Sequence, residues 1–391
     1  MSIDMIFMNY EKGARPAYDH DEATQFIINR FKQPEAERSF LNANYQDGRE
    51  WASEIRKWVK GLMLFDPPDV PLDAVMAEEE AFDGYKRLKY YYMAAEGCKS
   101  SAYVLIPDGL KAPAPAIVAL HDHSGQFFYG KEKLTEHKNP GDFLNYVQLW
   151  RYGGRGIASE LARRGYVVVV PDALGWGERG PWKESWLIPG MYDYLDAKNN
   201  LPQFIERYDK HAGGKFNDMC SHILYAGYTY PGIAVHNDMK SVDLLLTIPE
   251  VDKNRIGCTG LSMGGMRTTL LMAMDERICC GVPVGFPALY PYSLPQFNHS
   301  VWLVVPGLWQ SLPFPDLAAL AMPRKLLIMY CENDALFELH SMKASVETTS
   351  AAYKKAGLAD NCKYKGWPVG HQYDYDMQEY AFKWLGDCLN N

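Results

Sequence analysis

The chain has 391 residues, of which 47% are hydrophobic and 23% charged, and its formal net charge is -8 at pH 7. This balance is typical of globular proteins, and the acidic charge without any basic block argues against nucleic acid or an anionic membrane surface as a partner. The N-terminus lacks the pattern of a secretory signal, and no run of about 18 apolar residues exists, so we predict no membrane span.

The eight cysteines are scattered along the chain and form no C-x-x-C pair. Several lie within apolar, strand-like runs. We therefore predict reduced core cysteines in a cytoplasmic protein, without a disulfide or zinc framework.

In chain order, residues 20–65 are predicted to be helical, because their apolar side chains fall on one face. The runs 85–93 and 101–107 are rich in strand formers and predict an antiparallel hairpin. We accordingly divide the chain into an N-terminal helical extension, residues 1–80, and a main domain, residues 81–391.

The main domain alternates between short apolar runs and amphipathic segments. Strands are predicted at 116–120, 166–171, 255–260, 279–285, 325–330 and 361–367. Helices are predicted at 153–164, 236–248, 264–275, 341–356 and 377–388. Uniformly apolar strands that alternate with amphipathic helices predict an α/β fold, in which a mostly parallel sheet carries helices on both faces.

Two insertions interrupt the alternation, at residues 180–235 and 287–322. Both are long and rich in aromatic residues, and structureless loops of this length are uncommon inside a domain unless they are functional. Because both follow the carboxyl ends of strands, where such sheets bind ligands, we predict that they form a lid or pocket walls.

The segment RIGCTGLSMGGMRTTLL contains Ser262 within a G-x-S-x-G pattern, Gly260 to Gly264. A predicted strand precedes the pattern and a predicted helix follows it, which is the context of a nucleophilic serine on a strained turn. The alternative is a glycine-rich turn with an incidental serine.

A serine nucleophile needs a base and an acid that orients the base. In this kind of sheet the order along the chain is serine, acid, histidine. Asp334 and His371 follow later strands in this order, and Glu332 is the main rival for the acid. Asp172 also follows a strand but precedes the serine, so we interpret it as a structural turn residue.

Backbone N–H groups must stabilise the oxyanion of such a reaction. We predict that these belong to Met263, directly after the serine, and to His123 in the loop after the strand 116–120. His121 and His123 could instead form a metal pair, but no further ligands at a suitable spacing are present. We predict neither a metal nor a cofactor.

The pieces LHDHSG, PDALGWGERG, RIGCTGLSMGG, YCENDALF and GH (Gly370–His371) resemble the α/β-hydrolase superfamily. Over residues 100–391 the chain is most similar to the branch of dienelactone-hydrolase-like and acetyl-xylan-esterase-like proteins. The resemblance implies Ser262 as nucleophile, Asp334 as acid, His371 as base, and oxyanion donors at His123 and Met263. The chain differs from dienelactone hydrolases proper, which carry cysteine in place of Ser262. It also has Cys331 and Asp122 where glycines are usual.

The sequence thus predicts a serine hydrolase of carboxylic esters with the α/β-hydrolase fold. The substrate is expected to be a small acyl ester, acetyl-like, of a carbohydrate or other polar alcohol. Five tryptophans are candidates for stacking on sugar rings: Trp176, Trp182, Trp186, Trp302 and Trp309. The alternatives are a serine peptidase or lactonase of the same fold, or a binding protein without activity. The sequence does not fix the oligomeric state, and a homo-oligomer is compatible with it.

Overall fold

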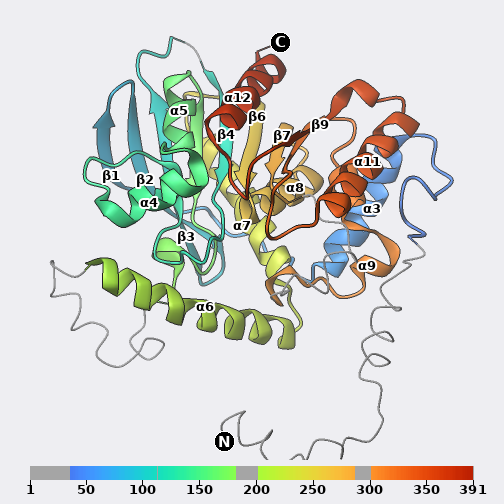
Figure 1. Cartoon of the computed structure of the whole chain (residues 1–391), viewed down its shortest axis with the longest axis horizontal. Coiled ribbons are helices and arrows are strands. Elements are labelled where there is room, and N and C mark those ends of the chain that lie inside the picture. Colours follow the sequence, from blue (N-terminus) through green and yellow to red (C-terminus); the bar gives the residue numbers. More distant parts are fainter. Residues whose placement is uncertain (1–35, 112, 182–200, 287–300, 391) are drawn as a thin grey trace, which may run out of the picture.

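The computed structural model describes residues 36–111, 113–181, 201–286 and 301–390 (Figure 1). The described strands form one nine-stranded sheet in the order β1-β2-β3-β5-β4-β6-β7-β8-β9. The first three strands pair antiparallel, and β3 also pairs antiparallel with β5. All pairs from β5 onwards are parallel. The predicted mostly parallel sheet of the α/β-hydrolase fold is thus confirmed.

The strands are β1 (Val75–Phe82), β2 (Tyr85–Ala95), β3 (Cys98–Pro107), β4 (Ala114–Leu120), β5 (Val167–Pro171), β6 (Val251–Leu261), β7 (Ile278–Val284), β8 (Lys325–Cys331) and β9 (Cys362–Trp367). The described α-helices are α3 (Gly48–Leu62), α4 (Gly141–Tyr152), α5 (Ile157–Arg163), α6 (Leu201–Tyr225), α7 (Tyr230–Thr247), α8 (Met263–Met274), α9 (Leu308–Ser311), α10 (Phe314–Ala319), α11 (Leu339–Lys355) and α12 (Tyr375–Leu389).

The central strands are apolar on both faces because helices cover both. In β8, Leu327 and Met329 join a core with α5 and α12. The alternate residues Leu326 and Ile328 join a second core with α8, α10 and α11 on the opposite face. This alternation follows from the two-residue period of a strand, so a continuous apolar run serves two cores at once.

The N-terminal part is only partly helical. Helix α3 lies within the predicted helix and confirms it for residues 48–62, but residues 36–47 form turns, so the prediction is wrong there. Contacts with distant residues hold these turns: Asp316 accepts a hydrogen bond from Ser39 Oγ (2.8 Å), and Lys355 Nζ donates to the carbonyl of Ala43 (3.0 Å). Residues 20–35 lie outside the described residues.

Strand β1 is an addition to the predicted elements. It precedes the predicted hairpin, which the structure confirms as β2 and β3, and it extends the sheet by one edge strand. Because β1 runs from Val75 to Phe82, it crosses the predicted boundary between residues 80 and 81. The division into two units stays a prediction.

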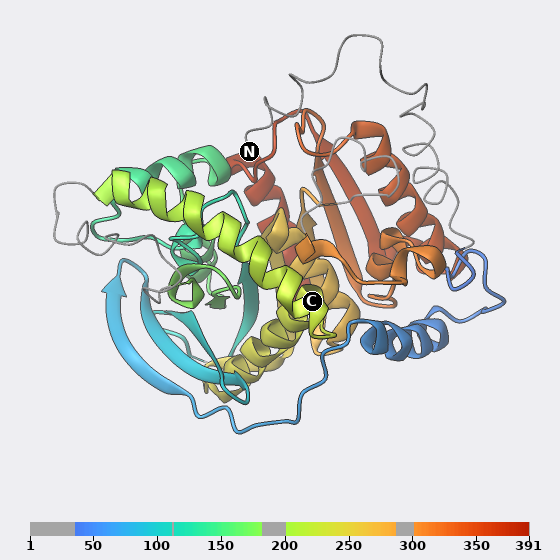
Figure 2. The same cartoon turned by 90° about the horizontal axis from the view of Figure 1, so that it is seen from below.

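The two insertions contain more regular structure than predicted. The first holds the 25-residue helix α6 and the start of α7, and the second holds α9 and α10. Their segments 182–200 and 287–300 lie outside the described residues. Helix α6 lies along the bottom of the molecule in Figure 1 and crosses the face seen in Figure 2. It is tied to the loop after β4, because Asp209 Oδ1 accepts the N–H groups of Phe127 (2.7 Å) and Phe128 (2.8 Å).

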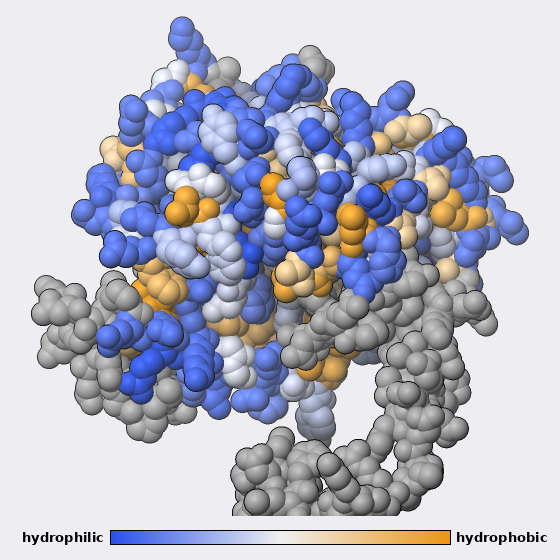
Figure 3. All heavy atoms as spheres, viewed as in Figure 1, coloured by the Kyte–Doolittle hydropathy of each residue, from blue (hydrophilic) through white to orange (hydrophobic). Residues whose placement is uncertain are grey.

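Helix α4 was not predicted, and α5 is shorter than the predicted helix 153–164. Of the helices in the described ranges, none combines the length and the apolar character that crossing a membrane requires. The face of the molecule seen in Figure 3 is mostly hydrophilic, with small, scattered hydrophobic patches.

Candidate active site

Ser262 lies at the junction of β6 and α8, at the carboxyl edge of the parallel strands. Its backbone has φ 59° and ψ -119°, a conformation that a residue with a side chain adopts only under strain. A hydrogen bond from the Ser262 N–H to the carbonyl of Val284 (2.8 Å) joins this turn to the end of β7. The strand-turn-helix context predicted for Ser262 is therefore present.

The flanking glycines allow a very close approach of α8 to β4. A Cβ atom at Gly260 would lie 2.4 Å from the carbonyl oxygen of Leu120, and one at Gly264 only 2.0 Å from the same oxygen. No side chain can be accommodated at either distance. The glycines thus let the helix begin directly beside the end of β4 and bring the loop after β4 close to Ser262.

His371 and Asp334 are in direct contact. His371 Nδ1 lies 2.6 Å from Asp334 Oδ2, and the side chains are 6% and 0% exposed. Asp334 also accepts the N–H of Leu336 (2.8 Å), which fixes the carboxylate. The rival acid Glu332 points elsewhere, because its Oε1 lies against Gly366 in β9, at 2.6 Å from the position of a Cβ there. The structure therefore pairs His371 with Asp334.

The second nitrogen of His371, Nε2, is buried and has no hydrogen-bond partner in the described part of the chain. The ring lies at the end of β7, where its Cε1 is 3.4 Å from the Cβ position of Gly285, and the preceding residue Val284 binds the Ser262 N–H. Ser262 and His371 thus both adjoin the carboxyl end of β7. Their side chains form no hydrogen bond among the described residues, and such contacts are often loose before substrate binds.

The two predicted oxyanion donors are on the two segments that adjoin Ser262. Met263 is the first residue of α8, so its N–H has no partner within the helix. His123 lies in the loop after β4, where its carbonyl accepts the N–H of Gln126 (3.1 Å) and its Nδ1 accepts the N–H of Gly125 (3.0 Å). Within the described ranges, the N–H of His123 itself has no acceptor. Both groups can therefore donate to a ligand.

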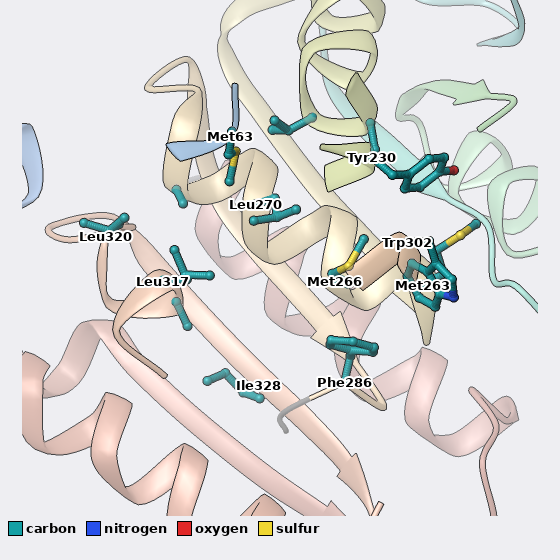
Figure 4. Close-up of a cluster of buried hydrophobic side chains, with 14 of the residues drawn as sticks. Met63, Tyr230, Met263, Met266, Leu270, Phe286, Trp302, Leu317, Leu320 and Ile328 are labelled. Carbon is teal, nitrogen blue, oxygen red and sulfur yellow. The ribbon is translucent and has the colours of Figure 1, made fainter. Parts of the chain in front are cut away.

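The ring of His123 is enclosed by aromatic side chains. It stacks on Trp302, with centroids 5.6 Å apart, and meets the edges of Trp176 (5.0 Å) and Phe127 (5.1 Å). This burial lowers the pKa of His123 to about 4, so the ring is neutral at pH 7. Trp302 also belongs to a cluster of buried apolar side chains that includes Met263 and Tyr230 (Figure 4).

A buried polar network, which the sequence did not indicate, holds the loop after β4. Lys133 Nζ donates to the carbonyls of Asp122 (2.8 Å) and Gln126 (3.2 Å), and the hydroxyl of Tyr152 donates to the Asp122 carboxylate. Burial alone would raise the pKa of Asp122, but Lys133 and the hydrogen bonds outweigh it, and the pKa lies well below its ordinary value. Asp122 is therefore a charged anchor of this loop.

Arg151, at the end of α4, links the two loops of the site. Its Nε donates to Ser124 Oγ (2.9 Å) in the loop after β4, and its Nη1 donates to the carbonyl of His371. The carbonyl of Arg151 accepts the N–H of Tyr373 (2.8 Å). No local motif marks Arg151, although Gly153 just beyond it, with φ 63°, is a signal for the end of a helix.

His121 and Asp172 have structural roles. His121 Nδ1 bonds to the carbonyl of Asp122 (2.9 Å) and Nε2 accepts the N–H of Ala173 (3.0 Å), so both ring nitrogens are occupied. Asp172 accepts from Lys131 Nζ (2.7 Å) and from Ser101 Oγ (2.7 Å), as expected for a structural turn residue. In the described ranges, no group of three or more His, Cys, Asp or Glu side chains is arranged to hold a metal.

An apolar cavity of about 460 Å³ lies beside α8, within the usual size range of ligand pockets. Met266, whose N–H donates to the carbonyl of Ser262 (2.9 Å), and Phe286 line the end of the cavity nearest the site. Figure 4 shows Met266, Leu270, Phe286 and Leu317 around this region. Residues 303–310, within the second insertion, form one wall of this cavity, and the role of the insertions as a lid or as walls of the substrate pocket stays a prediction.

Of the five tryptophans predicted to stack on sugars, the structure describes Trp176, Trp302 and Trp309. Trp176 and Trp302 are only 0% and 6% exposed and belong to the core, and Trp309 lines the cavity. This part of the prediction is wrong for Trp176 and Trp302, because large aromatic side chains contribute most when they are buried. Trp182 and Trp186 lie outside the described residues.

Comparisons with known proteins agree with the fold. A model of the Abhydrolase family matches residues 25–203. A Bacillus subtilis (strain 168) protein named "Putative hydrolase YtaP" is 24% identical over 265 residues, which are 67% of this chain and 74% of that protein. A putative acetyl xylan esterase from Bacteroides fragilis NCTC 9343 is similar in structure, with a TM-score of 0.64, 19% identity, and coverage of 92% of this chain and 84% of that chain. A glucuronoyl esterase from Solibacter usitatus has a TM-score of 0.60, 13% identity, and coverage of 96% and 99%.

Proposed function

We propose that the chain, which has the α/β-hydrolase fold, is a serine hydrolase of carboxylic esters that works through an acyl-enzyme. One observation carries the proposal. The Asp334 carboxylate binds Nδ1 of His371 at 2.6 Å, which leaves Nε2, buried and without a partner among the described residues, at the strand end where Ser262 occupies its strained turn. This arrangement suits a base that takes a proton from a serine hydroxyl.

In the proposed reaction, His371 Nε2 takes the proton of Ser262 Oγ as the oxygen attacks the ester carbonyl. Asp334 holds the Nδ1–H tautomer and stabilises the imidazolium that forms. The imidazolium then gives its proton to the departing alcohol, which leaves the acyl group on Ser262. A water molecule, deprotonated by the same nitrogen, attacks this acyl group, and the acid and the free serine hydroxyl result.

The tetrahedral oxyanion would be bound by the N–H groups of Met263 and His123. Each such donor contributes about 3 kcal/mol to the transition state. The neutral ring of His123 adds no positive charge at pH 7, so the proposed stabilisation comes from the backbone. Lys133, Asp122 and Arg151 would act indirectly, because they hold the loop that presents the His123 N–H.

For the substrate we propose a small, acetyl-like acyl ester of a carbohydrate or another polar alcohol. The names of two structural neighbours, a putative acetyl xylan esterase and a glucuronoyl esterase, support an ester of a carbohydrate. A second candidate is an ester with a longer aliphatic acyl chain. The apolar cavity of about 460 Å³ that begins one helical turn from Ser262 favours it.

Initial rates on p-nitrophenyl acetate, butyrate and octanoate would test the proposal and separate the two candidates. We expect turnover of the acetate in the wild type and its loss in Ser262→Ala. If kcat/KM rises from acetate to octanoate, the longer acyl chain is the better description. Comparing p-nitrophenyl acetate with p-nitroacetanilide, and with a simple lactone, would decide between the esterase and the peptidase or lactonase of the same fold. Unchanged ester turnover in Ser262→Ala would overturn the serine mechanism.

We further propose a cytoplasmic location. All eight cysteines are unpaired thiols in the structure, and five of them are buried, as is usual where the environment is reducing. Fractionation of the source cells, followed by detection of the chain, would test this.

A further inference from the structure

Helix α4 exposes an aromatic pair at its surface. Tyr146 and Trp150 are 57% and 41% exposed, and their ring centroids lie 6.0 Å apart with an angle of 26° between the ring planes. The spacing of four residues places both on one face of the helix. Leu149, 68% exposed, lies next to Trp150 in the chain. Exposed apolar groups gathered in this way often mark binding sites.

Arg151 connects this pair to the candidate active site. Its guanidinium carbon lies 3.5 Å from the centroid of the Trp150 ring, and the same guanidinium donates to the carbonyl of His371 and to Ser124 Oγ (2.9 Å). A single guanidinium group therefore links the Trp150 ring, on its face, to the backbone carbonyl of His371, at its edge. The stacking also holds the indole in one orientation, since Arg151 is itself fixed by these hydrogen bonds.

We propose that Trp150 and Tyr146 form a subsite for the alcohol portion of the substrate, on which a pyranose ring stacks. The inference rests on the proposed function and specifies its substrate class. A pyranose has a flat C–H face that matches an aromatic ring and a rim of hydroxyls that remains in water, which suits rings that are about half exposed. In the proposed reaction His371 protonates the departing alcohol, so a subsite tied to the His371 loop through Arg151 suits the alcohol portion.

A second copy of the chain is a poorer occupant of this surface. Three half-exposed side chains offer on the order of 300 Å² of apolar area, whereas a stable interface buries about 800 Å² on each partner. The Arg151 side chain faces the site rather than a neighbouring molecule, because both of its hydrogen-bonded groups belong to active-site loops.

The test compares two acetyl esters that differ only in the alcohol: a fully acetylated methyl pyranoside, and glycerol triacetate, which has no ring. We expect Trp150→Ala to lower kcat/KM for the pyranoside about tenfold, mainly through KM, and to lower that for glycerol triacetate less than twofold. Trp150→Phe should restore most of the loss, because it keeps a ring. Tyr146→Ala should give a smaller loss of the same kind.

Tyr364→Ala is the matched control, because Tyr364 is a similarly exposed aromatic residue (44%) on β9. It should change neither substrate. An equal loss on both esters in Trp150→Ala, or no loss on the pyranoside, would overturn the subsite while leaving the esterase proposal intact. A wild-type dimer that becomes a monomer in Trp150→Ala, seen by light scattering, would also overturn it. Unchanged turnover of both esters in Ser262→Ala would instead refute the proposed function.

Discussion

Asp334→Asn should remove most of the activity with little effect on substrate binding. The Asp334 side chain is 0% exposed, and its Oδ2 lies 2.6 Å from His371 Nδ1. Water therefore cannot take the place of the carboxylate and stabilise the charged imidazolium. An asparagine has nearly the same shape, but its amide neither enforces the required tautomer nor stabilises the imidazolium. In the serine triad this change lowers kcat about 10⁴-fold, which corresponds to ~5.5 kcal/mol in the transition state.

Glu332→Gln is the control, because it makes the same chemical change two residues away. Glu332 lies against Gly366 and does not contact His371, so we expect less than a twofold effect. The assay is the initial rate on p-nitrophenyl acetate, with the uncatalysed rate subtracted and folding checked by circular dichroism. If Glu332→Gln lost activity while Asp334→Asn kept more than a tenth of it, the pairing of His371 with Asp334 would not be the catalytic one.

Two further predictions concern the packing around the site. Gly264→Ala should lower the free energy of unfolding by about 3 kcal/mol or more, because its Cβ would lie 2.0 Å from the carbonyl oxygen of Leu120. Gly214→Ala, on the open surface of α6, should instead add up to about 1 kcal/mol, and similar urea midpoints for the two variants would contradict this account. Burial raises the pKa of Asp209 from 3.8 to about 6. Between pH 3.8 and about 6, the carboxyl is therefore protonated in the folded state and ionised in the unfolded state, so the free energy of unfolding falls as the pH rises through this range. The free energy of unfolding, measured with urea, should differ between pH 4 and pH 7 by up to ~3 kcal/mol less in Asp209→Asn than in the wild type. An unchanged pH dependence in the variant would show that the Asp209 carboxyl is not protonated in this way.

The local patterns in the sequence predicted the central strands and the turn at Ser262. Strand β5 is four valines and a proline, all buried, and no amphipathic helix has such a pattern. Asp334 and His371 could be proposed because strand ends of a parallel sheet meet at one edge. Their contact at 2.6 Å is a property of the structure, and the order of residues along the chain gives no distance.

Elements held by tertiary contacts could not be predicted in this way. Helix α4 buries Gln148 and Arg151 beside Leu144 and Val147, so its inner face lacks a clear apolar period. Strand β1 contains three consecutive glutamates, which are poor strand formers. Cross-strand ion pairs with β2, Lys89 to Glu78 at 2.9 Å and Arg87 to Glu80 at 2.6 Å, help to hold it in the sheet.

The roles of Arg151 and Lys133 were hidden for the same reason. Each residue bonds to backbone or side-chain groups of loops that only the folded chain brings together. The exposed ring of Trp150 was equally hidden, because the sequence does not distinguish a surface tryptophan from a core one. Composition instead drew attention to Trp176 and Trp302, which are buried.

The most direct test of the central claim is covalent labelling of the whole chain with a fluorophosphonate, followed by mass mapping of the modified peptide. We predict one label per chain, on Ser262, with loss of esterase activity in proportion to labelling, and no labelling of Ser262→Ala. His371→Ala should react far more slowly, because the hydroxyl then has no base. A label on another residue that accompanies inactivation, or full activity in a chain labelled at Ser262, would contradict the account.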